Sequence, residues 1–175
     1  MALTPPPANS ARLLTRMALL TAIALTIFMA EAQLPAIAPA IPGVKLGLAN
    51  IVTVYAVFLL GPGDALLILS ARVFLGAVFS GQMMTLLYSA GGGLLAWGVM
   101  VLLRRLLSER QIWLCSPVAA VGHNVGQLLV AAGVLRTWAV MAYLPYLLLA
   151  GVISGLFTGL CAQFLIAHLK KTGQS

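Results

Sequence analysis

The chain consists largely of long apolar stretches, with charged residues held mostly to the segments between them. Of its 175 residues, 62% are hydrophobic and only 7% are charged, whereas a soluble globular domain is typically about 25% charged. An α-helix needs about 20 apolar residues to cross a bilayer, and several of the stretches reach that length. The sequence therefore predicts an all-α integral membrane protein.

Six apolar stretches indicate a six-transmembrane-helix bundle. They run near 13–34, 46–60, 64–81, 83–107, 112–135 and 138–168. The second is the weakest, because it has only about 15 residues. We expect a single transmembrane domain over 12–170, a flexible cytoplasmic tail over 1–11 and a second cytoplasmic tail over 171–175.

Basic residues predict the orientation of this bundle. With both chain ends in the cytoplasm, seven of them lie inside and only two near the outer face, which is the bias that orients membrane proteins. The seven are Arg12, Arg16, Arg104, Arg105, Arg110, Lys170 and Lys171, and the two are Lys45 and Arg136. An odd number of spans would remove this bias.

The first span has an alternative interpretation. Arg12 and Arg16, the apolar run after them and Ala30-Glu31-Ala32 resemble a signal peptide with an A-x-A cleavage site. Retention is favoured because cleavage would leave only five spans. Both possibilities stay open at the level of sequence.

Glycines recur at helical spacing in the later spans. Two rows, Gly151, Gly155 and Gly159 and then Gly122 and Gly126, predict close helix packing. The run Gly91, Gly92 and Gly93 predicts a kink or a place where a backbone or ligand approaches closely.

Polar side chains gather in the outer half or near the middle of the spans, which predicts a cavity open to the outside above an apolar plug. They are Glu31, Gln33, Lys45, Asn50, Ser80, Gln82, Tyr88, Ser89, His123, Asn124 and Gln127. A channel would instead be expected to carry polar groups through both halves.

Three of the candidate substrate-binding residues each have a simpler alternative role. Arg72 lies near the middle of the third span and should face the bundle, either in a structural ion pair or carbonyl bonds or against an anionic ligand group. Lys45, in the run PGVKLGLAN, could bind ligand or extend toward the headgroups. Asn50 could bind ligand or cap and cross-link helices, and Glu31 is a possible partner for either cation.

The fifth span carries a polar group of its own. His123 and Gln127 are one helical turn apart and Asn124 follows His123, so they could bond to other helices or contact a ligand. Tyr88 and Ser89 complete the candidate set.

No catalytic motif is visible in the sequence. The three acids, Glu31, Asp64 and Glu109, are too far apart in sequence to suggest paired carboxylates that hold Mg²⁺ around a diphosphate. Cys115 and Cys161 lack metal or redox spacing, and no Walker A sequence or clustered basic surface for nucleic acid occurs. We predict no enzyme activity, no metal, no cofactor and no nucleic-acid partner.

Four runs in order, PGVKLGLANIVTVY, SARVFLGAVFSG, LLYSAGGGLLAW and AVGHNVGQLLVA, resemble the Gx transporter family, also catalogued as heptaprenyl diphosphate synthase component I. The resemblance covers about residues 15–168. That family is similar to the substrate-binding S components of energy-coupling factor (ECF) transporters, which have six helices with both ends inside. The resemblance implies a multi-pass protein of the bacterial plasma (inner) membrane.

The resemblance also implies roles for residues and partners. Lys45 and Asn50, with the fifth-span group, would bind a small-molecule substrate. Ala18 and Ala22 match the AxxxA pattern by which S components dock on a transmembrane T subunit, and ABC-type ATPases would supply energy. With Lys45 and Arg72 available, we expect a compact, partly anionic, vitamin-like or flavin-like molecule. The alternative function is a non-catalytic membrane component of heptaprenyl diphosphate or quinone biosynthesis.

Overall fold

The computed structural model describes residues 8–33, 45, 47–107 and 111–171. Within these residues the chain is helical, and the order is α1 (Ala8–Glu31), α2 (Asn50–Leu59), α3 (Pro62–Ser80), α4 (Met83–Arg104), α5 (Ile112–Leu135), the 3₁₀ helix η2 (Trp138–Tyr143) and α6 (Leu144–Lys171). The predicted all-α class is confirmed. The helices also fall on the six predicted stretches, although most helix ends differ from the predicted ends by a few residues.

Five of these helices are long and apolar enough to cross a membrane: α1, α3, α4, α5 and the η2–α6 segment. The chain is therefore a multi-pass membrane protein. The exception is α2, whose ten residues rise only about 15 Å, half of the hydrocarbon thickness. The predicted second span is thus a half-length helix.

Residues at the helix ends explain where the chain turns. Pro62 lies in the first turn of α3, where a missing N–H leaves no hydrogen bond unmade. Gly81 ends the same helix in the left-handed conformation, with φ of 65°. The short α3–α4 connection follows from this cap. The helices at the two ends of the chain extend into the predicted tails. The first helix, α1, begins at Ala8, so residues 8–11 of the predicted N-terminal tail are helical, and α6 continues to Lys171. The rest of both predicted tails lies outside the described residues.

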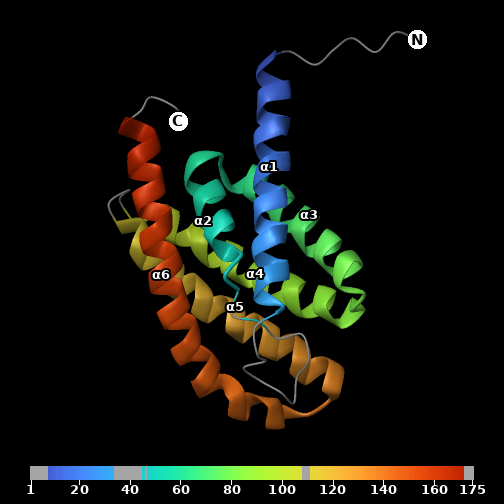
Figure 1. Cartoon of the computed structure of the whole chain (residues 1–175). Coiled ribbons are helices and arrows are strands. Elements are labelled where there is room, and N and C mark those ends of the chain that lie inside the picture. The colour runs from blue at the N-terminus through green and yellow to red at the C-terminus, as the bar shows by residue number, and fades with distance from the viewer. Residues whose placement is uncertain (1–7, 34–44, 46, 108–110, 172–175) are drawn as a thin grey trace, which may run out of the picture.

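The helices pack as a bundle in which α5 lies between α4 and α6, and α3 lies between α1 and α4. The short α2 contacts α3, α4, α5 and α6 as well as α1, and Figure 1 shows it in the space between α1 and α6. The N-terminal end of α1 and the C-terminal end of α6 lie at the same end of the molecule (Figure 1). The two ends of the described chain therefore lie at the same end of the bundle, while the orientation in a membrane stays a prediction.

Glycines bring the later helices into backbone contact. A Cβ atom on Gly126 would lie 2.5 Å from the Gly91 carbonyl oxygen of α4, and one on Gly155 would lie 2.5 Å from Cα of Pro117 in α5. Such distances are too short for a real side chain. The glycine rows therefore set the close approach of α5 to α4 and α6, as the sequence predicted.

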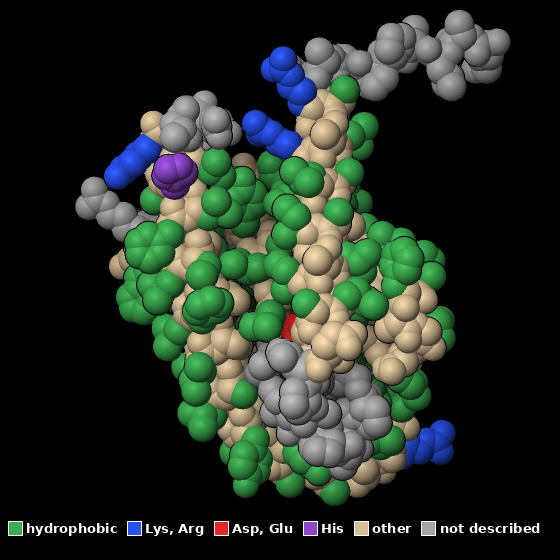
Figure 2. Space-filling model, in the orientation of Figure 1, with side chains coloured by type: hydrophobic (Ala, Val, Ile, Leu, Met, Phe, Trp, Pro, Cys, Tyr) green, Lys and Arg blue, Asp and Glu red, His purple; other side chains and the backbone are tan. Residues whose placement is uncertain are grey.

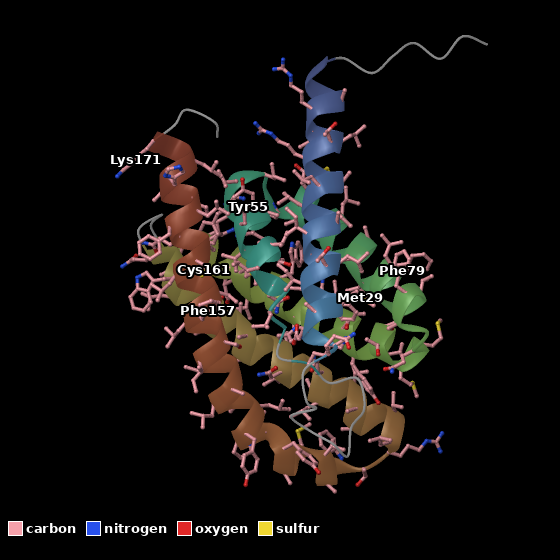
Figure 3. All side chains as sticks on the ribbon, in the orientation of Figure 1. Met29, Tyr55, Phe79, Phe157, Cys161 and Lys171 are labelled. Carbon is pink, nitrogen blue, oxygen red and sulfur yellow. The ribbon has the colours of Figure 1, made fainter. Side chains whose placement is uncertain are left out.

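Large apolar side chains cover the outside of the bundle. Phe79 on α3 and Phe157 on α6 point outward (Figure 3), with 64% and 67% of their surfaces exposed. Hydrophobic side chains cover much of the face seen in Figure 2, and most of the visible basic side chains lie at its upper end. These exposed apolar side chains are suited to contact with lipid.

The interior differs between the two halves of the bundle. An apolar cluster that includes Val54, Ile68, Met100 and Ile112 fills much of the core. Beyond it, toward the end where α1 finishes and α2 begins, buried polar side chains gather. The division is not complete, because Ser116 and Thr158 form a buried hydrogen bond elsewhere in the core, so the predicted outward cavity above an apolar plug stays a prediction.

Candidate functional site

The start of α2 is held in place by the end of α1. The two carboxylate oxygens of Glu31 accept hydrogen bonds from the backbone N–H groups of Gly47, at 2.7 Å, and Leu48, at 3.0 Å. Irregular backbone at membrane depth is tolerated only where protein satisfies its hydrogen bonds. Glu31 thus satisfies the backbone ahead of α2 and makes no direct bond to the cations suggested by sequence.

Gly47 is needed for this turn. Its φ of 79° lies in the left-handed region that favours glycine. A Cβ atom here would lie 2.8 Å from Asn50 Nδ2 and 2.9 Å from His123 Nε2. The turn therefore packs directly on the side chains of Asn50 and His123.

Lys45 lies two residues before Gly47 in the sequence and contacts both α1 and α5. Its backbone N–H donates to Gln127 Oε1 at 3.1 Å, and its Nζ lies 3.5 Å from the centre of the Phe28 ring on α1. Burial lowers the pKa of Lys45, and the Arg72 charge acts in the same direction against the opposing effect of Glu31. Lys45 therefore points into the bundle. Pro42–Val44, which precede it in the sequence motif, lie outside the described residues.

Gln127 and His123 form one unit on α5. Gln127 Nε2 lies 2.6 Å from His123 Nε2, so the amide joins the imidazole on one side and the backbone of Lys45 on the other. Both side chains also pack against Gly92 of α4, where a Cβ atom would meet Gln127 Cγ at 2.7 Å. The glycine run in α4 is the close approach predicted from sequence.

Arg72 is buried in the middle of α3, with 3% of its surface exposed. Its guanidinium carbon lies 5.8 Å from the same Phe28 ring that Lys45 contacts. Its Nε and Nη2 atoms have no hydrogen-bond partner among the described residues. The prediction that Arg72 faces the bundle interior is confirmed.

Buried polar atoms on two other candidate residues also lack partners within the described part of the chain. They are both amide atoms of Asn50 and Nδ1 of His123. Buried polar groups in proteins are nearly always hydrogen-bonded, so a group of unpaired ones needs an explanation. We call the set Lys45, Asn50, Arg72, His123 and Gln127 the polar cluster.

Three candidates from the sequence do not share these contacts. Asn124 donates through Nδ2 to the Leu147 carbonyl of α6, so it connects α5 to α6. Tyr88 packs with Leu128, Ala131 and Leu147 in a second apolar cluster, and Ser89 is buried in α4. A ligand contact for these three stays a prediction.

Phe28 and Gly47 are parts of the site that sequence reasoning did not select. Phe28 stands in an unbroken apolar run, where nothing distinguishes it from a lipid-facing residue. Gly47 belongs to the run PGVKLGLAN, but no feature of that run predicts its left-handed turn. The contacts of Phe28 with Lys45 and Arg72 form only when α1 and α3 pack together.

A different groove lies at the opposite end of the bundle. It has a volume of about 160 Å³ and is lined by α1, α2 and α6. The lining residues are Arg16, Leu19, Leu20, Tyr55, Leu59, Leu60 and Leu169. Its lining is mostly apolar, so it offers little of the hydrogen bonding found in the polar cluster.

Metal ligands are not grouped in the described part of the chain, where no three His, Cys, Asp or Glu side chains lie close enough to hold an ion. Cys115 and Cys161 are free thiols. The described chemistry of the site is therefore that of two cations, an imidazole and two amides.

Comparison with known families gives one match. The model of the family described as heptaprenyl diphosphate synthase component I matches residues 20–165. No curated protein and no solved structure matches the chain significantly. The matched range includes every member of the polar cluster.

Proposed function

The chain belongs to the heptaprenyl diphosphate synthase component I family, and from this premise we propose that it is a non-catalytic membrane subunit that binds a small molecule for ATP-driven uptake. The main supporting observation is a group of buried polar atoms on Asn50, Arg72 and His123 that have no hydrogen-bond partner in the described part of the chain. Leaving such groups unpaired costs about 1–3 kcal/mol each. A bound polar molecule would offset that cost.

The placement of the polar cluster fits capture from outside. The cluster lies in the half away from the two described chain ends, which carry Arg12, Arg16 and Lys171. With these basic residues in the cytoplasm, the polar cluster faces the exterior. This orientation, in the bacterial inner membrane, is part of the proposal.

Energy would come from partners. The proposed assembly contains a transmembrane T subunit and ABC-type ATPases, as in ECF transporters. Ala18 and Ala22 on α1 are exposed and one turn apart, which is the kind of small-residue surface on which another helix packs closely. These two residues are the proposed docking surface.

A second candidate function rests on the family description. A component numbered I implies at least one further component, so the chain would anchor or assist a partner that makes heptaprenyl diphosphate. Diphosphate chemistry of prenyl groups needs carboxylates that hold Mg²⁺. We therefore place any such catalysis in the partner.

Affinity purification from native membranes distinguishes the two functions. Co-purification of a T subunit with ABC ATPases would support uptake. Recovery of only a soluble prenyl diphosphate synthase would overturn uptake in favour of the second candidate. Native mass spectrometry of the same preparation would detect a retained small molecule.

A further inference from the structure

The Arg72 guanidinium is buried, and the described residues leave part of its hydrogen-bonding capacity unused. It is 3% exposed, and Nε and Nη2, the two donors on one edge of the guanidinium, have no partner among the described residues. Burying a charge without pairing costs several kcal/mol. A guanidinium edge of this kind matches the two oxygens of a carboxylate or phosphate.

The acids of the described chain are engaged or distant. Both Glu31 oxygens accept backbone hydrogen bonds, from Gly47 and Leu48. Asp64 lies in the first turn of α3, eight residues before Arg72, and so about 12 Å away along the helix. Two cations, Lys45 and Arg72, therefore share the site with a single carboxylate, Glu31, whose charge acts on both of them. Among the described residues of the site, one positive charge is left over.

The two cations are also directed toward the same place. The Phe28 ring of α1 packs against Gly76 of α3. Lys45 Nζ lies 3.5 Å and the Arg72 guanidinium carbon 5.8 Å from the centre of this ring. A ring face attracts cations but carries no net charge. The ring thus holds both side chains near one another without neutralising them.

We propose that Arg72 binds an anionic group, a carboxylate or a phosphate, of the molecule taken up, with Lys45 as the second cation. This inference rests on the proposed function and adds the chemical class of the ligand. Asn50 and His123 supply neutral polar atoms beside the cations, so they would contact the uncharged polar part of the same molecule.

The experiment measures thermal unfolding of the full chain in detergent, with inorganic phosphate and acetate titrated separately against chloride at matched ionic strength. A ligand that binds only the folded state raises the unfolding temperature in a saturable way. We expect such a rise with at least one of the two anions. Which anion acts decides between phosphate and carboxylate.

Arg72→Gln should weaken that anion's apparent affinity by at least about tenfold, the usual effect of losing hydrogen bonds to a charged group. Without anion it should unfold at the wild-type temperature or higher, because an uncompensated buried charge is gone. Arg72→Lys should recover only part of the affinity, since it lacks the planar pair of donors. Arg104→Gln, an exposed residue at the far end of α4, is the matched control and should bind as wild type.

Three results would overturn the inference. One is the absence of any saturable shift in the wild-type chain, which requires no variant to fold. Another is an Arg72→Gln chain that loses stability without anion yet keeps its anion response, as expected of a purely structural arginine. The third is a shift caused by anionic phospholipid and by neither soluble anion.

Failure of this inference remains separable from failure of the proposed function. A neutral small molecule retained by the wild-type chain and lost in Asn50→Ala would sustain uptake while refuting an anionic ligand. Saturable anion binding without any T subunit or ATPase partner would do the reverse.

Discussion

Glu31, the last residue of α1, accepts a 2.7 Å hydrogen bond from the backbone N–H of Gly47, sixteen residues later. A second bond, from Leu48 to the other carboxylate oxygen, makes the contact two-pronged. The contact positions the turn that leads into α2. The same turn also positions Lys45, two residues before Gly47, and Asn50, three residues after Gly47.

Glu31→Gln should destabilise the fold by about 1.5–3 kcal/mol, because hydrogen bonds to a charged acceptor are replaced by one neutral acceptor. Thermal unfolding in a fixed detergent measures the loss. Asp64→Asn is the matched control, and a loss of less than about 1 kcal/mol is expected from its place at the start of α3. Equal losses in the two variants would refute a special role for Glu31.

Gly47→Ala should cost about 1–3 kcal/mol, because an alanine at φ of 79° is strained. Its Cβ would also displace Asn50 and His123, so ligand retention should fall as well. Gly98→Ala provides the comparison, since a Cβ at Gly98 of α4 meets nothing within 4 Å. That change should be neutral or stabilising by up to about 1 kcal/mol. Unfolding temperatures and native mass spectra test both expectations.

Gly126→Ala should push α5 away from α4, because its Cβ would overlap the Gly91 carbonyl. Overpacking of this kind typically costs about 1–3 kcal/mol. Gly133→Ala, in the same helix but with open space around its Cβ, should leave stability unchanged or slightly higher. If Gly126→Ala unfolds at the same temperature as Gly133→Ala, the backbone contact does not limit packing.

Ala22→Leu should abolish co-purification of the proposed T subunit, because a large side chain prevents close helix approach. Ala18→Leu should act in the same way. Both residues are exposed on α1, so unfolding temperature and ligand retention should stay at wild-type values. Leu14→Ala, at an exposed site nearer the helix start, serves as a control. An intact complex in both leucine variants would show that docking occurs elsewhere.

Helix positions were predictable because apolar runs of membrane length admit few other structures. The exception is instructive. The stretch 46–60 is as apolar as its neighbours, but its first residues form a turn held by Glu31, so α2 starts only at Asn50. Nothing within the stretch itself indicates this, since the carboxylate that fixes the turn belongs to α1.

Part of the candidate site was predictable as well. Spacing alone placed His123 and Gln127 on one face of α5, and they do form a hydrogen-bonded unit. Asn124 is only one residue further along the same helix, yet it turns to α6 and bonds the Leu147 carbonyl. About 100° of helical rotation separates neighbouring residues, and the packing partners decide which of them reaches the cluster.

The sequence by itself determined the class of protein, the approximate ends of its helices and the presence of expensive polar residues inside apolar segments, because the bilayer penalises every unpaired polar group. Only the tertiary structure decided how those polar groups are used. It assigned Glu31 to backbone N–H groups and brought Phe28 against both Lys45 and Arg72, and it left Nε and Nη2 of Arg72 without a partner among the described residues. Pairing between distant segments depends on how helices pack, and local sequence does not encode it.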